Sequence, residues 1–165
     1  MSFDSRAFRT TLGTFATGVT VITTRPPEGE ALGITVNSFA SVSLDPPLVL
    51  FSLDRASHSF GAFAAASHYV VNVLADDQQD LSRRFAKTGQ HGVEGVEAEI
   101  GVGGCPRLTG ALAQLECAIE ARHDGGDHVI YVGRVLGFHM RDDGQPLLYF
   151  RSRYADVAPV VPTVS

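Results

Sequence analysis

A short polar run between two apolar segments is the first place where the residue types suggest chemistry. Asn37, Ser38, Ser41 and Ser43 follow a β-branched segment and precede a Pro-Pro turn. Small hydroxyls and backbone groups can pair with the alternating donors and acceptors of a flat heterocycle without adding bulk. The alternative is a polar turn that only connects two strands, and the residue types alone leave both interpretations open.

A second group of residues suits an anion. Ser57 stands at the start of an Ala-rich segment, 57–66, that is predicted to be a short helix. The free N–H groups and the dipole at a helix N-terminus favour a phosphate. Arg55 lies nearby in the sequence, and the Arg83-Arg84 pair lies on a later predicted helix. The alternatives are an ordinary helix cap at Ser57 and a solvated helix face for the arginines.

The motif HDGGDH at 123–128 places two histidines and two aspartates within six residues. Imidazole and carboxylate ligands suit several divalent ions, but the spacing across a two-glycine turn matches no structural zinc pattern. We therefore predict a polar turn and no metal. The segment GVGGCP at 101–106 fails as a dinucleotide loop, because Pro106 stands at its sixth position and no helical pattern follows. The chain has no GxxxxGK[ST], HExxH or GxSxG motif.

The elements that must position these residues are mostly strands. Phe8, Leu12 and Phe15 share one face of a predicted N-terminal helix, which Asp4 or Ser5 caps and Gly18 follows. Further helices are predicted at 57–66 and 76–86. Strands are predicted at 18–24 and 31–37, which form a hairpin, and at 48–53, 69–74, 128–140 and 146–150.

Two segments are harder to assign. Residues 111–123 have helical propensity, yet their apolar and polar side chains alternate strictly, which favours a strand leading into a Gly125-Gly126 turn. Residues 87–107 hold six glycines and are predicted to be a loop. The tail after Tyr154, with Pro159 and Pro162, is predicted to be extended. Many strands with few short helices indicate a β-barrel or sandwich, and we expect one domain over residues 1–165 with 155–165 as the tail.

Composition excludes several classes. The net charge is −5 and no Lys/Arg cluster offsets it, so we expect no nucleic-acid partner. No apolar run approaches the roughly 20 residues that span a bilayer, so we expect no membrane association. The first twenty residues include Asp4, Arg6 and Arg9 and do not read as a signal peptide. With only Cys105 and Cys117, outside any CxxC pair, a cytoplasmic protein with free thiols is expected.

Three stretches resemble the short-chain flavin reductases of two-component monooxygenases. They are GITVNSFASVSLDPPLVLFSL at 33–53, GDHVIYVGRV at 126–135 and PLLYFRSRYADV at 146–157, and the segment FRTTLGTFATGVTVITT at 8–24 also matches. The resemblance implies an FMN-binding split β-barrel of Greek-key type with a few short helices. It also implies a homodimer that uses FMN or FAD, takes hydride from NADH or NADPH, and serves a partner flavin-dependent monooxygenase component.

The resemblance also implies a set of flavin contacts. The predicted contacts are Thr35, Asn37, Ser38, Ser41, Val42, Ser43, Arg55, Ser57, Arg84, Phe85 and Tyr154. Phe85 lies four residues after Leu81 and is equally explained as a core residue. Tyr154 is assigned to the nicotinamide side, with a dimer or core anchor as its alternative. One departure from the family pattern is Phe150, where a second tyrosine is common, although Tyr149 remains.

His128 is the predicted catalytic residue, because the first residue of a long strand lies at the barrel rim. Its imidazole can donate a hydrogen bond to the nicotinamide carboxamide or to a phosphate. The Asp127 side chain is expected to point away from it, as neighbours on a strand do. Two other functions stay open: an oxidase of the pyridoxamine-phosphate-oxidase type on the same fold, and a non-catalytic flavin- or haem-binding module.

Overall fold

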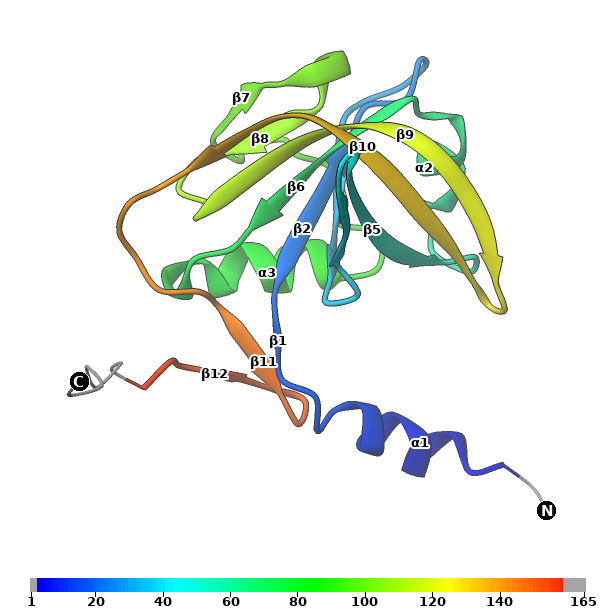
Figure 1. Cartoon of the computed structure of the whole chain (residues 1–165), viewed down its shortest axis with the longest axis vertical. Helices are drawn as coiled ribbons and strands as arrows, with labels where there is room; N and C mark the ends of the chain where they lie inside the picture. The colour runs from blue at the N-terminus through cyan, green and yellow to red at the C-terminus, as the bar shows by residue number, and fades with distance from the viewer. Residues whose placement is uncertain (1–2, 159–165) are drawn as a thin grey trace.

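The apolar and alternating segments of the chain pair into one curved antiparallel sheet, as the computed structural model of residues 3–158 shows (Figure 1). Its seven strands, in spatial order, are β3 (Leu32–Val36), β2 (Thr20–Thr24), β6 (His68–Val73), β9 (Ala113–Gly125), β10 (His128–Met140), β5 (Pro47–Asp54) and β4 (Ala40–Leu44). The predicted fold class, mainly β with a few short helices, is confirmed.

The sheet curls into a barrel that is split along one side. β3 and β4 are its two edge strands, and within residues 3–158 no ladder joins them. β3 instead approaches β5 across the gap. The helix α3 (Gln79–Ala86) packs against β3, and α2 (Phe60–Ala65) follows β5 at the opposite side. Edge strands carry backbone groups without a ladder partner, so the split is where the barrel can hold a ligand.

An aromatic cluster fills the barrel. Phe51 and Tyr131 stack with ring centroids 5.0 Å apart, and Phe63 and Tyr69 meet Phe51 edge-on. The hydroxyls of Tyr69 and Tyr131 are buried, and neither has a hydrogen-bond partner in the described part of the chain. Tyr69 reaches the backbone of Gly133 so closely that a Cβ placed there would lie 2.1 Å from the tyrosine oxygen. Only glycine fits at this position of β10.

Both cysteines are free thiols in the interior, as predicted. Cys105 and Cys117 are fully buried and unbridged. Burial raises the pKa of the Cys117 thiol to about 12, and burial also raises the pKa of Cys105. Each sulfur therefore stays protonated near neutral pH.

Smaller elements lie outside the barrel. A three-stranded sheet pairs β1 (Thr17–Gly18) with β11 (Leu148–Phe150) and β11 with β12 (Arg153–Ala155). The helix α1 (Ser5–Leu12) extends from this sheet away from the barrel (Figure 1), and none of its residues is buried. The remaining elements are the strands β7 (Ala98–Ile100) and β8 (Pro106–Leu108) and the 3-10 turns η1 (Asp76–Gln78) and η2 (Val102–Gly104).

Several predicted boundaries were wrong. α1 ends at Leu12 and Gly13 is its C-cap, whereas Gly18 belongs to β1 and pairs with Leu148. Asp4 is its N-cap, as one of the two predicted candidates, and accepts the N–H groups of Arg6 and Ala7 at 2.9 and 3.0 Å. The segment 87–107 is not a plain loop, since it contains β7 and the first residues of β8. The prediction for Pro159 and Pro162 lies outside the described residues.

The segment 111–123 is a strand, as its alternation predicted. β9 runs from Ala113 to Gly125 and pairs with both β6 and β10. The turn that joins it to β10 consists of Gly126 and Asp127, one residue later than the predicted Gly125-Gly126 pair. Gly126 has φ +73°, the left-handed backbone that two-residue hairpin turns require.

Candidate functional site

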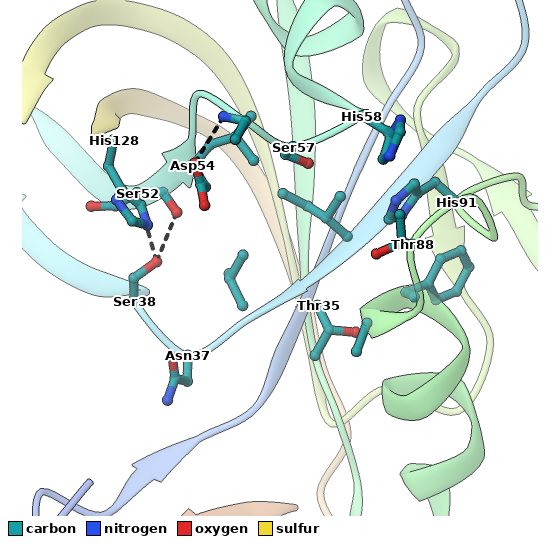
Figure 2. Close-up of a pocket in the computed structure, with 16 residues that line it drawn as sticks. Thr35, Asn37, Ser38, Ser52, Asp54, Ser57, His58, Thr88, His91 and His128 are labelled. Atoms are coloured by element: carbon teal, nitrogen blue, oxygen red, sulfur yellow. Dashed lines mark hydrogen bonds between the residues drawn. The ribbon is translucent and has the colours of Figure 1, made fainter. Parts of the chain in front are cut away.

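A pocket of about 520 Å³ lies in the split of the barrel. Its walls come from β3 and the segment that follows it, the end of β5 with the turn after it, the residues after α3, and the start of β10 (Figure 2). The lining residues are Ile34, Thr35, Val36, Asn37, Ser38, Ser52, Leu53, Asp54, Ala56, Ser57, His58, Phe85, Ala86, Thr88, His91 and His128. The set is rich in small polar groups and imidazoles, and it holds no lysine or arginine.

The β3 wall offers backbone groups. The N–H of Gly33 donates to the carbonyl of His91 at 2.8 Å, on the side of β3 away from β2. Backbone groups on a strand alternate in direction, so those of Thr35 face the same side as those of Gly33. The Thr35 hydroxyl itself donates to the carbonyl of Ser82 in α3 at 2.7 Å. Because the Thr35 hydroxyl donates to Ser82, the group of Thr35 that is left to pair with a ligand is its main chain.

Ser38 holds the opposite wall together. Its hydroxyl accepts from the N–H of Ser52 at 3.0 Å and lies 3.1 Å from the carbonyl of Ser52, to which it donates. These two bonds replace ladder bonds where β4 no longer covers β5 (Figure 2). Ser38 lines the pocket with its hydroxyl already paired, and its contact with a flavin stays a prediction. Asn37 beside it is exposed and also lines the pocket.

His128 lies at the rim, on the first residue of β10, where it is opposite Asp54 of β5. Its Nδ1 is 2.7 Å from the Asp127 carboxylate. The prediction that Asp127 points away was wrong, because Asp127 belongs to the turn and not to the strand, so the alternation of strand neighbours does not apply to it. The hydrogen bond to His128 lowers the pKa of the Asp127 carboxyl. With Nδ1 engaged, Nε2 is the ring nitrogen left for a ligand.

The expected polar run splits into two parts. Ser41, Val42 and Ser43 belong to β4, not to a loop, and none of them lines the pocket. Ala40, Val42 and Leu44 alternate with the two serines, so the period of a strand was present in the sequence, but these apolar side chains are exposed and mark no core face. The part of the run that reaches the site ends at Ser38.

Neither predicted arginine reaches the pocket. Arg55 forms an ion pair with Asp124 on the β9–β10 hairpin. The Arg84 guanidinium donates to the carbonyls of Gly92 and Glu94 and so holds the segment after α3. Both side chains are long enough to reach partners outside the pocket, although their positions in the sequence suggested a phosphate contact.

Ser57 lines the pocket, but it does not cap a helix. α2 starts at Phe60, after Ser59, and is only six residues long. Ser57 lies in a turn in which its N–H donates to the carbonyl of Asp54 at 3.0 Å and its hydroxyl accepts from the N–H of Ser59 at 3.3 Å. An anion at Ser57 would therefore meet a turn and not the end of a helix dipole.

Phe85 is a core residue that also lines the pocket. It is 1% exposed and belongs to a core cluster, as one of its two interpretations predicted, and its contact with a flavin stays a prediction. A Cβ at Gly33 would lie 3.1 Å from this ring, so the glycine lets Phe85 form the floor.

Tyr154 lies in a second, smaller hollow of about 200 Å³. This hollow shares Thr35, Val36, Asn37 and Ala86 with the main pocket, so the two adjoin along β3. The Tyr154 hydroxyl donates to the Ser82 hydroxyl at 2.8 Å, and the Arg83 guanidinium lies 5.4 Å from the centre of the Tyr154 ring.

Sequence reasoning missed six lining residues that carry polar groups or shape the turn: Ser52, Asp54, Ala56, His58, Thr88 and His91. Ser52 alternates with Phe51 and Leu53, so strand periodicity contained a signal for it. His91 lies in the glycine-rich segment, where no pattern pointed to a site.

The side chains of the HDGGDH motif were considered as candidate metal ligands in the sequence. Within residues 3–158 no group of three or more His, Cys, Asp or Glu side chains is arranged to hold a metal ion. No helix in the same range is both long and apolar enough to cross a membrane.

Comparison with known proteins gives a consistent set of matches. A family model described as flavin reductase like domain matches residues 12–158. The FMN reductase (NADH) SmoA of Agrobacterium fabrum is 50% identical over 146 residues, which are 88% of this chain and 82% of SmoA. The reductase subunit HsaB of a flavin-dependent monooxygenase from Rhodococcus jostii is 41% identical over 158 residues, covering 96% of this chain and 80% of HsaB.

A solved structure matches the fold just described. It is the NADH:FAD oxidoreductase SgcE6 of Streptomyces globisporus C-1027, in complex with NAD and FAD fragments. Its TM-score is 0.89 at 35% identity, over 97% of this chain and 98% of that one.

Proposed function

The chain belongs to the flavin reductase family, and from this premise we infer that it is an NAD(P)H:flavin oxidoreductase. It transfers hydride from reduced nicotinamide to FMN or FAD and supplies the reduced flavin to a partner monooxygenase component. The observation that carries this function is the pocket in the split of the barrel, which opens beside unpaired backbone of β3.

The residues present fit a flavin. Backbone groups of Thr35 and Asn37 can pair with the donors and acceptors of its ring edge. The Phe85 ring supplies an apolar floor, and His91 Nδ1 is a buried nitrogen without a partner among the described residues. When bound, the flavin supplies the hydride acceptor, so no nucleophile or metal is required of the protein.

The roles of the side chains are proposals. The β3 backbone orients the ring system, and the turn at Ser57 faces the phosphate. His128 Nε2 hydrogen-bonds the nicotinamide carboxamide, and Tyr154 lines the adjoining hollow. Catalysis then consists of holding two rings in contact while water is kept away, which lowers the entropic part of the barrier. Hydride transfer between the two rings requires no acid–base pair from the protein.

Purified protein mixed with NADH and excess FMN tests the function. Nicotinamide absorbance is expected to fall catalytically, with many turnovers per protein molecule when flavin is in excess. Loss of absorbance that continues in air on the bound flavin alone, with no stimulation by added flavin, would favour the oxidase type. No loss at all, with flavin still bound, would favour a non-catalytic module.

We further propose that the chain forms a homodimer. β10 continues past the end of β5, and its outer residues Leu136, Phe138 and Met140 are 55%, 74% and 75% exposed. Leu44, at the neighbouring end of β4, is 96% exposed. This apolar patch is unusual for a monomer, and a second copy of the chain would cover it symmetrically.

Light scattering at micromolar concentration is expected to give about 35 kDa, twice the 17.6 kDa of one chain. Phe138→Lys should shift the mass towards 17.6 kDa, because it places a charge inside the buried patch. Ile100→Lys is the matched control, since Ile100 is 83% exposed on β7 and lies outside the patch. A monomeric wild-type protein would refute the dimer.

A further inference from the structure

We propose that His58 and His91 form the phosphate-binding end of the pocket, so that affinity for phosphorylated flavin depends on pH. The inference rests on the proposed function, since it takes a flavin to be the occupant. In this proposal the imidazoles of His58 and His91 contact the phosphate, in place of the arginines that the sequence suggested.

The two histidines come from different elements and meet at one end of the pocket. His58 belongs to the turn between β5 and α2, and His91 belongs to the segment after α3. Figure 2 shows them together with Thr88, at the end away from His128, Ser38 and Ser52. The pocket therefore has two distinct polar ends, and a ligand with a ring and a remote anion matches that arrangement.

His91 is held in place and carries an unused nitrogen. Its carbonyl accepts the N–H of Gly33 at 2.8 Å, and the next residue, Gly92, forms a β-bridge with Leu32. Its Nδ1 is buried and lacks a hydrogen-bond partner among residues 3–158. Buried polar atoms are nearly always paired, so an unpaired ring nitrogen on a residue that lines a pocket is a candidate partner for a ligand atom. When Nδ1 carries a proton, it can donate a hydrogen bond to a phosphate oxygen.

Positive charge for a phosphate must come from these imidazoles. The other titratable groups that line the pocket are Asp54, whose carboxylate accepts the N–H of Ala56 at 2.8 Å, and His128 at the far end. Around the pocket, Arg55 is paired with Asp124.

The groups behind His91 are also engaged or turned outward. Arg84 is bound to the carbonyls of Gly92 and Glu94. Lys87 and Glu94 are exposed on the same segment, outside the lining. No permanent cation lines the phosphate end, so its charge depends on protonation of His58 and His91.

The direction of the pH effect follows from linkage. A bound phosphate favours the protonated form of an imidazole beside it, so phosphate binding is expected to be tighter at the lower pH. The second ionisation of a phosphate monoester also lies near pH 6, so measurements at pH 6.5 and 8.5 keep FMN mainly dianionic. Over this interval the charge of the ligand changes little, so a change in affinity reports on the protein.

The test is the Kd of FMN and of riboflavin, measured by flavin fluorescence at pH 6.5 and 8.5. Riboflavin has the same ring and no phosphate. For wild-type protein the FMN Kd should rise about fivefold between the two pH values, because charge-assisted hydrogen bonds become neutral ones. The riboflavin Kd should stay constant. The wild-type comparison alone tests the inference, even if a variant fails to fold.

The variants assign the effect. His58→Gln/His91→Gln together should make the FMN Kd independent of pH, because glutamine retains hydrogen-bonding capacity and carries no charge. His123→Gln is the matched control, an exposed histidine on β9 outside the pocket, and it should retain the wild-type response. Constant FMN affinity in the wild type, or an unchanged response in the double variant, overturns the inference and leaves the proposed function standing. Absence of any flavin binding and of NADH oxidation refutes both.

Discussion

His128→Ala is expected to lower kcat/KM for NADH by about tenfold or more, while the Kd for flavin changes by less than about twofold. The reason is position. His128 stands at the rim of the pocket opposite Asp54, and its Nδ1 is fixed by Asp127 at 2.7 Å, so its Nε2 is presented to whatever occupies the opening. Steady-state kinetics with NADH varied at saturating flavin, together with a flavin titration, measures both quantities.

Two variants sharpen this prediction. His123→Ala removes an exposed imidazole from the same hairpin and should leave the kinetics unchanged. Asp127→Asn keeps an acceptor for Nδ1 without the charge, and we expect a smaller loss than for His128→Ala. If His128→Ala retains the wild-type kcat and KM, the nicotinamide contact belongs elsewhere, and Tyr154 in the adjoining hollow is the next residue to change.

Gly133→Ala is expected to lower the free energy of unfolding by about 3 kcal/mol, the upper part of the range for overpacked cores. The added methyl would lie 2.1 Å from the Tyr69 oxygen. The Tyr69 ring is packed against Phe51, so it cannot move away from the methyl without disturbing the core. For a chain of this size the melting temperature should fall by about 6–12 °C. Thermal unfolding followed by circular dichroism measures the change.

Gly137→Ala is the control, because it lies on the same strand and a Cβ there meets nothing within 4 Å. Its melting temperature should stay within about 2 °C of the wild type. Equal melting temperatures for wild type and Gly133→Ala would mean that the Tyr69 ring moves aside without cost and that the core is looser than described.

Strand periodicity predicted the barrel well, because one face of each strand meets the core. The best example is 111–123, where strict alternation outweighed helical propensity and β9 forms as expected. β4 was missed although Ala40, Val42 and Leu44 alternate with two serines, because the serines were interpreted as a polar run in a loop. At the sheet edge the apolar side chains of this strand are exposed, so they do not mark a core face.

The site was predictable where main chain and short side chains form it, at Thr35, Asn37, Ser38 and Ser57. The site was not predictable where a long side chain can reach several alternative hydrogen-bond partners. Arg55 and Arg84 bind a hairpin carboxylate and two loop carbonyls, while His91 reaches the pocket from a glycine-rich segment. Such choices depend on the distance between elements far apart in the sequence.

The burial of both thiols affects how well the protein resists oxidative inactivation during turnover. Reduced flavin that escapes into aerated solution reacts with dioxygen and yields hydrogen peroxide, so a protein that makes it works beside an oxidant. Peroxide attacks thiolates far faster than thiols. Cys117, with a pKa of about 12 and no exposed surface, and the equally buried Cys105 offer peroxide almost no thiolate. Catalytic lifetime in air is therefore set by residues other than cysteine.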